Sequence, residues 1–473
     1  MARLPDTRSR RIPCYFNEQP NTVWFASDLT TLTRYGSVVT TPDVTALGWF
    51  LLAEDITHPR TCVAGVNELI GGRRIAIGDT GTLSAELWSP WMLTGPDKIM
   101  DDPVTAASSL RETITACVGA VTAGPKTILL RLSGGLDSSI LAAALKVGGS
   151  QFAGLNLVTD NPRGDERDFA RCVANHLGVS LFERKRQVND VALLQSQAGE
   201  IPRPSARSFT QASSRLSVDV AHAIGADLVV DGGGGDQLFC SLRTARMAAD
   251  CLLSPSGEGR FWTTAASLAR LAEVSTLHVA WRAWAVRCRT SPALHFPIDL
   301  RFLEAELRDM AQLAVAHPWL VAPQDALPGK AGHIAALLQA QTFVRGANVV
   351  EELPLISPLM SQPIVELCLR IPTWLTVEQA TDRAIARRAF APLLPVSIIG
   401  RQSKGSPDSF VIELFEANRT TIRRMLLDGQ LAALGLLDLE TLARSISDDR
   451  PVAGVDFYRI MRLVDVEAWL RAL

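Results

Sequence analysis

The pattern of hydrophobic and polar residues changes near residue 100. Before it, short strand-like runs such as NTVWFA (21–26) and RRIAIG (73–78) alternate with polar turn sequences. This alternation predicts a small β-rich domain over residues 1–100. A charged stretch that contains turn-forming residues, TGPDKIMDDP (94–103), leads into a second domain, which we predict over residues 101–473.

In the second domain, hydrophobic runs of strand length alternate with patterns of helical period. In the segment DERDFARCVANHLG, an apolar helical face ends at Gly178, a typical helix stop. Alternating strands and helices indicate an α/β fold with a doubly wound parallel sheet, and beyond residue 240 the patterns are mainly helical. The strands are predicted at 127–132, 152–158 and 226–231, the helices at 104–121, 138–146 and 165–178, and the apolar face of the last helix at Phe169, Cys172, Val173 and Leu177.

The first glycine-rich loop of this domain, SGGLDSS (133–139), lies between a predicted strand and a predicted helix. Glycines let the backbone approach an anion, and the amides and hydroxyls of Ser133 and Ser138 can donate to phosphate oxygens. The loop lacks the spacing and the lysine of a P-loop. Asp137 would repel a phosphate unless a cation lay between them, so we expect Mg²⁺ there. The alternative is a plain strand-to-helix turn.

The second glycine-rich loop, DGGGGDQLF (231–239), also follows a hydrophobic strand. Ligands of parallel α/β sheets bind at the carboxyl ends of the strands, where both loops are predicted to lie. Four consecutive glycines imply a close approach of the backbone, and Asp236 is a second potential Mg²⁺ ligand. A flexible glycine turn is the alternative.

Length, charge and cysteine content limit the classes of protein to which this chain can belong. The 473 residues favour two domains, and 47% hydrophobic residues suffice for packed cores. With 47 basic and 49 acidic residues, the net charge of −2 gives no reason to expect nucleic acid or a membrane surface as partner. We see no signal peptide and no run long enough to span a membrane. Eight cysteines without a CxxC pair indicate a reduced, cytoplasmic protein, in which Cys172 and Cys368 look like small core residues. The seven histidines show no metal-binding spacing.

Taken together, the motifs resemble the asparagine synthetase superfamily, which carries a pyrophosphatase loop of this kind. The resemblance covers residues 105–470 and rests on the two glycine loops with four later or intervening motifs. It implies cleavage of ATP to AMP and pyrophosphate, activation of a carboxylate as an acyl-adenylate, and attack by an amine to form an amide. The four motifs are DERDFAR (165–171), PLMSQPIVE (358–366), DRAIARRAFAPLLP (382–395) and RQSKG (401–405).

The resemblance assigns roles to individual residues. Asp137 and Asp236 match the Mg²⁺ ligands, and Lys404 matches the catalytic lysine that neutralises charge at the adenylate. A solvated loop lysine is the alternative for Lys404. The matches to the pyrophosphate loop are Ser133, Gly134, Gly135, Asp137 and Ser138, and the matches to positions beside the nucleotide are Leu132, Gly232 and Gly233.

The sequence departs from the family in two places. Glutamine-dependent asparagine synthetases need a cysteine at position 2, where this chain has Ala2, so we expect a shortened, degenerate glutaminase-like front domain. β-Lactam synthetases carry a tyrosine of a tyrosine–glutamate dyad where this chain has Gly233. Glu351 and Glu352 could supply a base instead, although an exposed acidic pair is the simpler interpretation.

The GGGGD-x-x-FC string and the R-x-SKG string look most like lasso peptide cyclases. The expected function is therefore a lasso macrolactam synthetase, which joins the N-terminal amine of a precursor core peptide to an Asp or Glu side chain. The resemblance also implies a leader peptidase and a leader-binding protein as partners. A β-lactam-like or other small-molecule amide synthetase remains an alternative, as does an inactive scaffold homologue.

Aromatic and arginine residues gather at WRAWAVRCR (281–289). Such a mixture suits peptide binding. A pair of core-facing tryptophans with solvated arginines is the alternative. The residues concerned are Trp281, Arg282, Trp284, Arg287 and Arg289.

Overall fold

The computed structural model describes residues 13–78, 81–159, 164–288, 296–347, 353–402, 405, 408–447 and 456–473. Five residues of interest from the sequence lie outside this part of the chain: Ala2, Arg289, Glu351, Glu352 and Lys404.

A five-stranded parallel sheet forms the centre of the α/β region, in the order β10-β9-β6-β7-β8. The predicted parallel sheet is confirmed, and its three expected strands correspond to β6, β7 and β9. Two strands were not predicted: β8 is an edge strand with no fully buried residue, and β10 has only two residues. The strands are β6 (Ile128–Arg131), β7 (Phe152–Val158), β8 (Leu181–Lys185), β9 (Leu228–Val230) and β10 (Leu355–Ile356).

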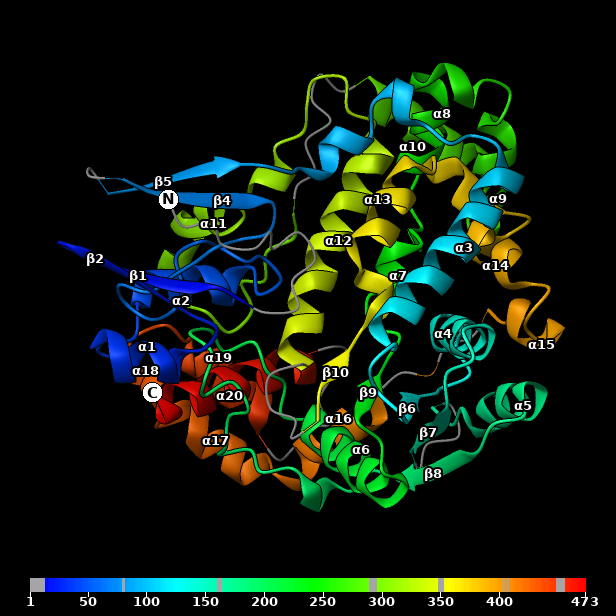
Figure 1. Cartoon of the computed structure of the whole chain (residues 1–473). Coiled ribbons are helices and arrows are strands. Elements are labelled where there is room, and N and C mark those ends of the chain that lie inside the picture. Colours follow the sequence, from blue (N-terminus) through cyan, green and yellow to red (C-terminus); the bar gives the residue numbers. More distant parts are fainter. Residues whose placement is uncertain are drawn as a thin grey trace.

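Helices cover both faces of this sheet (Figure 1). In β6, Leu129 points into the core cluster shared with α6, whereas Ile128 and Leu130 point into the cluster shared with α4. Because both faces are covered, the strand reads as a continuous hydrophobic run. The three predicted helices are observed as α3 (Pro103–Val121), α4 (Leu136–Val147) and α5 (Arg167–Leu177), and α6 (Thr210–Ile224) precedes β9.

Helix α5 ends as expected, and Phe169, Val173 and Leu177 of its predicted face pack against the core, whereas Cys172 does not. Gly178 adopts φ 64° and caps the helix, which confirms the predicted stop. The fully buried residues are Ala170, Val173 and Ala174, however, and Cys172 is only half-buried, with its Sγ 3.4 Å from Ser397 Oγ. The prediction of a core role for Cys172 is therefore wrong. For Cys368, which is 4% exposed, it is confirmed.

The region beyond residue 240 is mainly helical, as predicted. The long helix α12 runs through the middle of the molecule, with α8, α9 and α10 packed together near one end of it (Figure 1). A short hairpin joins β11 (Val377–Glu378) and β12 (Thr381–Asp382). The helices are α7 (Gly235–Leu238), α8 (Arg246–Leu253), α9 (Phe261–Leu271), α10 (Thr276–Arg287), α11 (Ala311–Ala314), α12 (Pro328–Ala347), α13 (Gln362–Arg370), α14 (Ala384–Phe390), α15 (Val396–Ile399), α16 (Asp408–Ala417), α17 (Arg419–Leu427), α18 (Gln430–Ala433), α19 (Leu439–Ile446) and α20 (Asp456–Ala472).

The first hundred residues contain antiparallel strands, as predicted, and two helices that were not. The strands form a sheet of order β2-β1-β3 and a separate β4–β5 hairpin. The boundary at residue 100 and the glutaminase-like character of this region stay predictions. The elements are β1 (Tyr15–Gln19), β2 (Thr22–Ala26), α1 (Leu29–Gly36), α2 (Val44–Leu52), β3 (Asn67–Glu68), β4 (Arg73–Gly78) and β5 (Gly81–Glu86).

This N-terminal region packs directly against α20 (Figure 1). Arg459 of α20 donates from Nη2 to the carbonyl of Leu51 at 2.8 Å, and Arg462 pairs with Glu54. The Oγ1 of Thr40 donates to the carbonyl of Leu473 at 2.9 Å. Residues of α2 and α20 also belong to the same hydrophobic core cluster.

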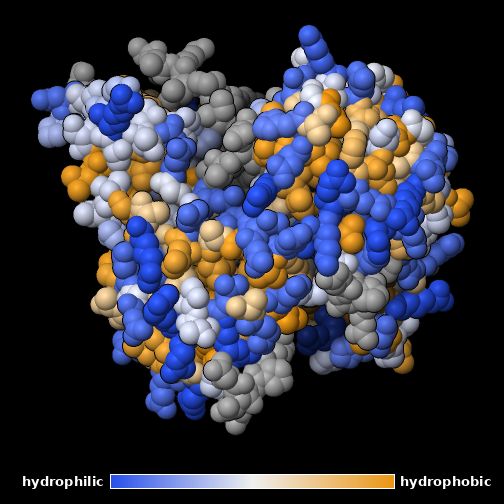
Figure 2. Space-filling model, turned by 90° about the horizontal axis from the view of Figure 1, so that it is seen from below, coloured by the Kyte–Doolittle hydropathy of each residue, from blue (hydrophilic) through white to orange (hydrophobic). Residues whose placement is uncertain are grey.

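On the face shown in Figure 2, hydrophilic and hydrophobic residues of the described part are interspersed. Among the helices of the described residues, none is both long and apolar enough to cross a lipid bilayer.

Candidate functional site

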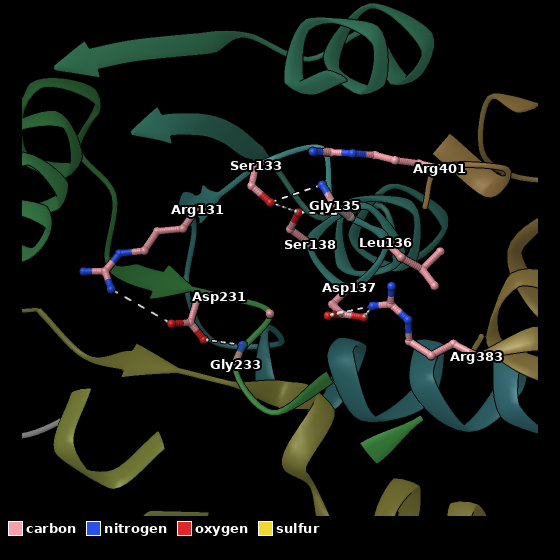
Figure 3. A pocket seen from close by; sticks show the side chains of 11 residues that line it. Arg131, Ser133, Gly135, Leu136, Asp137, Ser138, Asp231, Gly233, Arg383 and Arg401 are labelled. Carbon is pink, nitrogen blue, oxygen red and sulfur yellow. Dashed lines mark hydrogen bonds and ion pairs between the residues drawn. The ribbon is translucent and has the colours of Figure 1, made fainter. Parts of the chain in front are cut away.

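The two glycine loops meet at the carboxyl ends of β6 and β9 (Figure 3). Between them lies a cavity of about 250 Å³, which we call the loop cavity. It is also lined by three arginines that sequence reasoning did not assign, Arg131, Arg383 and Arg401. The structure therefore brings together most of the expected phosphate-binding residues, and those that line the cavity are Ser133, Gly135, Asp137, Ser138, Gly232 and Gly233.

The first loop is shaped by its own serines. Gly135 N donates to Ser133 Oγ at 3.1 Å, and Ser138 Oγ lies 3.2 Å from Ser133 Oγ. Ser139 Oγ donates to the Gly135 carbonyl at 2.8 Å, and α4 begins at Leu136. The first turn of α4 and the serine hydroxyls consequently face the cavity, an arrangement suited to phosphate oxygens.

Gly134 has a packing role, and its predicted role in phosphate binding stays a prediction. It adopts φ +72°, and a Cβ there would lie 2.4 Å from the backbone carbonyl carbon of Phe169 in α5. The residue is absent from the lining of the loop cavity. Its glycine character therefore serves the close packing of the loop on α5.

The four glycines of the second loop bring the two loops together. A Cβ at Gly232 would lie 3.0 Å from Ser138 N, and one at Gly235 would lie 2.4 Å from Asp137 Cγ. Gly234 adopts φ +80° and packs against Met360. The close approach predicted from the sequence is thus, at these positions, an approach to the protein's own chain, and it sets the position of Asp137.

A Gly235→Ala substitution should displace the Asp137 carboxylate, because the new methyl group would overlap Asp137 Cγ. A misplacement of about 1 Å in a catalytic site can cost roughly a hundredfold in rate, and we expect a loss of that size in ATP turnover. Gly119→Ala in α3 is the matched control, since its Cβ would meet nothing within 4 Å. Turnover assays of both variants check the prediction. Equal rates for Gly235→Ala and wild type would contradict it.

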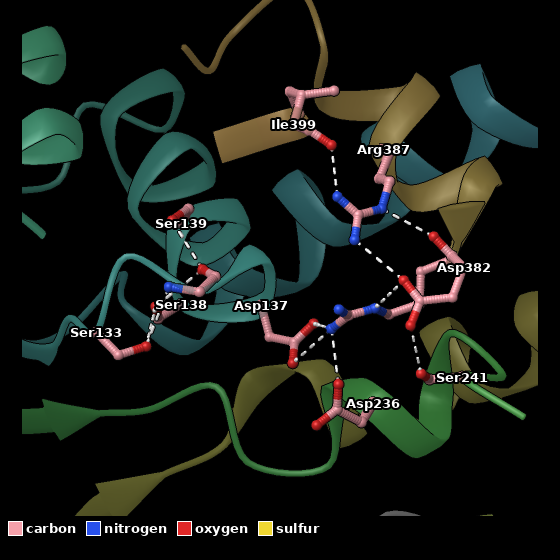
Figure 4. A network of polar contacts seen from close by, with 11 residues as sticks. Ser133, Asp137, Ser138, Ser139, Asp236, Ser241, Asp382, Arg387 and Ile399 are labelled. Carbon is pink, nitrogen blue, oxygen red and sulfur yellow. Dashed lines mark hydrogen bonds and ion pairs between the residues drawn. The ribbon is translucent and has the colours of Figure 1, made fainter. Parts of the chain in front are cut away.

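The two predicted Mg²⁺ carboxylates converge on one position (Figure 4). Arg383 Nη1 lies 3.2 Å from Asp137 Oδ1 and 2.7 Å from Asp236 Oδ1. Burial by itself lowers the pKa of Arg383, but Asp137, Asp382 and Asp236 outweigh it and raise the pKa, so the guanidinium is charged. Asp236 is brought to the site on α7, directly after the second loop.

Arg383 is fixed by its backbone and by a second arginine. It adopts φ 53° immediately before α14, in the left-handed region. Its neighbour Asp382 accepts from Ser241 Oγ at 2.8 Å and from Arg387 Nη2 at 3.0 Å. Although burial raises the pKa of Asp382, the adjacent Arg383 and these hydrogen bonds lower it below its usual value. The β11–β12 hairpin thereby places one fixed cation between two carboxylates.

Asp137 and Asp236 are the residues that would hold a divalent cation here. Within the described residues no group of three or more His, Cys, Asp or Glu side chains is arranged to hold a metal ion alone. Mg²⁺, however, is usually bound by one or two carboxylates with phosphate oxygens and water. Asp137 and Asp236 already share a cation contact, so the residues present fit Mg²⁺ bound together with a nucleotide.

A second cavity, of about 190 Å³, adjoins the loop cavity through Arg131 and Ser133. Leu132, Leu155 and Leu157 contribute apolar walls. Asn156 donates from Nδ2 to the Leu132 carbonyl at 3.0 Å, while its Oδ1 is buried without a hydrogen-bond partner. Apolar walls with an unsatisfied polar atom suit a flat heterocyclic base, and the charged Arg131, Glu166 and Arg186 line the rest of this cavity. The position of Leu132 beside a nucleotide stays a prediction.

Besides Arg131, sequence reasoning assigned no role to three charged residues of the loop cavity, Asp231, Arg383 and Arg401. Asp231 accepts from Gly233 N at 2.9 Å and from Ser357 Oγ at 2.6 Å, and so fixes the second loop to the end of β10. Arg383 and Arg401 stand in DRAIARR and RQSKG, motifs that had been recognised. Nothing in those motifs indicates which arginine turns toward the loops.

The tryptophans of α10 are exposed, so the core-facing interpretation is wrong. Trp281 is 62% exposed and Trp284 is 54% exposed. The guanidinium carbon of Arg287 lies 4.8 Å from the centroid of the Trp284 ring. Peptide binding at this helix stays a prediction.

Comparison with known proteins places these observations in a wider context. Residues 109–471 match the family model described as asparagine synthase. The chain is also 30% identical over 145 residues to the tRNA-specific 2-thiouridylase MnmA of Geobacter metallireducens. That match covers 25% of this chain and spans 39% of the length of the relative.

Proposed function

Because this chain belongs to the asparagine synthase family, its chemistry is that of an ATP-dependent ligase, and we propose that it closes an amide bond within a peptide. The specific activity proposed is that of a lasso macrolactam synthetase. The observation that carries the nucleotide chemistry is the convergence of Asp137 and Asp236 on one cation position beside the serine–glycine loop.

ATP fits the two adjoining cavities. The base would occupy the cavity walled by Leu132, Leu155 and Leu157, and the phosphates would occupy the loop cavity beside Ser133 and Ser138. Asp137 and Asp236 would hold Mg²⁺, which would neutralise phosphate charge and favour departure of pyrophosphate. Transfer of AMP to a carboxylate would leave a mixed anhydride, and attack by an amine would release AMP.

Lys404 is proposed as the residue that stabilises negative charge at the adenylate, and Glu351 or Glu352 as a possible base. All three lie outside the described residues. Their assignment rests on the sequence motifs alone.

Two observations favour a peptide over a small-molecule substrate. Gly233 stands where β-lactam synthetases have their tyrosine, so a strong base is not supplied there. A peptide α-amine needs less help, because its pKa is about 8. The exposed Trp281 and Trp284 also offer aromatic surface of the kind that binds peptides. A leader peptidase and a leader-binding protein would complete the pathway.

The proposal is tested by incubating the enzyme with ATP, Mg²⁺ and a leaderless precursor peptide encoded beside it. We expect AMP and pyrophosphate together with a peptide that has lost one water. Acetylation of the peptide N-terminus, or exchange of its acceptor Asp or Glu for Asn or Gln, should abolish the product. ADP and phosphate would contradict adenylation. Incorporation of an external amine would favour the small-molecule synthetase instead, and absence of any turnover would favour the scaffold.

A further inference from the structure

Arg401 is a buried arginine whose hydrogen-bonding capacity is only partly used. Its side chain is 5% exposed, and Nη2 donates to Glu166 Oε1 at 2.7 Å. Its Nε and Nη1 are buried and have no hydrogen-bond partner. Buried donors without partners are rare, and each one calls for an explanation such as a ligand.

The guanidinium is held firmly in one place. Its central carbon lies 3.8 Å from the centroid of the Phe169 ring, a stacking distance. Glu166 accepts not only from Arg401 but also from Gly405 N, at 3.0 Å. Since Phe169 packs against Gly134, the arginine is stacked on the residue that supports the first loop.

The residue that carries the two unused donors lies at the wall of the loop cavity. Arg401 lines this cavity, and Figure 3 shows its guanidinium end extending toward Ser133 and Gly135. Arg383 differs from Arg401, because its guanidinium already forms ion pairs with Asp137, Asp236 and Asp382. Arg401 therefore has donors available for a ligand at the N-terminal end of α4, where the serine hydroxyls also face.

Resting on the proposed nucleotide chemistry, we propose that Arg401 is a binding residue for the phosphate oxygens of ATP and of the pyrophosphate product. Guanidinium N–H groups make strong, charge-assisted hydrogen bonds with phosphate oxygens. Because Nη2 is bonded to Glu166, the free Nε and Nη1 lie on different edges of the guanidinium, and each would donate to a separate oxygen. Glu166 and Phe169 act as positioning residues that orient the guanidinium. A substrate carboxylate would satisfy the same two donors, but the position beside the serine loop favours phosphate.

The experiment measures binding of inorganic pyrophosphate and of adenosine by titration calorimetry, in the presence of Mg²⁺, for wild type and Arg401→Ala. Loss of two charge-assisted hydrogen bonds should weaken pyrophosphate binding roughly ten- to a hundredfold. Adenosine binding should change less than about twofold, since adenosine carries no phosphate. Arg401→Lys, which retains the charge but not the two separate guanidinium donors, should bind pyrophosphate with an affinity between those of wild type and Arg401→Ala. If thermal melting shows that Arg401→Ala does not fold, the pyrophosphate binding of Arg401→Lys is compared with that of wild type instead.

Arg171→Ala is the matched control. Arg171 lies on α5 and pairs with Glu183 at 2.6 Å, a contact as short as that of Arg401, but it lines neither cavity. It should bind pyrophosphate like wild type.

The outcomes separate three interpretations. Wild-type pyrophosphate binding in the folded Arg401 variants, with a raised KM for the peptide that carries the carboxylate, would overturn the proposal in favour of a carboxylate site. Equal weakening for adenosine would assign Arg401 a structural role only. Production of ADP by the wild type would contradict the proposed function without bearing on these binding data.

Discussion

Asp137→Asn and Asp236→Asn are each expected to abolish formation of AMP and pyrophosphate. Both substitutions keep the shape of the side chain and remove its charge at the position where the two carboxylates converge. A bridging metal contributes several kcal/mol to stabilising transferred charge, and each 1.4 kcal/mol corresponds to a factor of ten in rate. We therefore expect losses of roughly a thousandfold or more, measured as pyrophosphate release. Raising the Mg²⁺ concentration should recover part of the activity.

The control for these two variants is Asp168→Asn. Asp168 is a carboxylate of α5 that is 95% exposed and lies 3.4 Å from Arg171. Its loss should leave the rate within about twofold, because exposed ion pairs contribute little. If Asp137→Asn and Asp236→Asn both retained the wild-type rate, the site would have been assigned to the wrong carboxylates.

Arg383→Met is expected to destabilise the protein and to make its stability depend on Mg²⁺. Without the guanidinium, Asp137 and Asp236 would lose the ion pairs that they now share, at 3.2 Å and 2.7 Å. Removal of one partner from a buried ion pair costs about 3–5 kcal/mol, and we expect the lower end because Asp236 is 32% exposed. Mg²⁺ would no longer compete with the arginine, so it should raise the melting temperature of this variant more than that of the wild type.

Thermal melting in EDTA and over a series of Mg²⁺ concentrations checks this expectation. Arg388→Met is the matched control. It removes an arginine of α14, five residues after Arg383, that pairs with Glu378 at the surface at 2.8 Å. That variant should melt close to the wild type at every Mg²⁺ concentration. A stable Arg383→Met protein in EDTA, with no greater response to Mg²⁺, would show that the two carboxylates do not share a cation position.

The central fold could be predicted from the sequence where burial is complete. Ile128, Leu129 and Leu130 are all buried, so the run is unmistakably a strand, and Gly178 marks the end of α5 by its left-handed backbone. Strand β8 lacked such a signal because Phe182 and Glu183 are both only half-buried, and its pairing with β7 comes from tertiary structure. Local pattern cannot supply that information.

The candidate site likewise contains residues that local motifs identify and residues that only the fold brings into place. Asp137 and Asp236 were recognised because each stands in a local motif beside glycines. Arg383 lies 246 residues from Asp137 in the sequence, and only the fold brings the two together. The left-handed backbone conformation of Arg383 also cannot be recognised from the residue types in the sequence. The local signal for Arg383 is the arginine-rich DRAIARR motif, whose charges need acidic partners when the motif is buried.

The packing of the N-terminal region against α20 has a consequence for the order in which the chain acquires its structure. Leu51, whose carbonyl accepts from Arg459, is separated from that arginine by 408 residues. During synthesis, at about 5–20 residues per second, tens of seconds would pass between the appearance of these two partners. In that interval α2 lacks its contacts with α20. We therefore expect the first elements of the chain to mature late, and nascent chains that stop before α20 to need protection from aggregation.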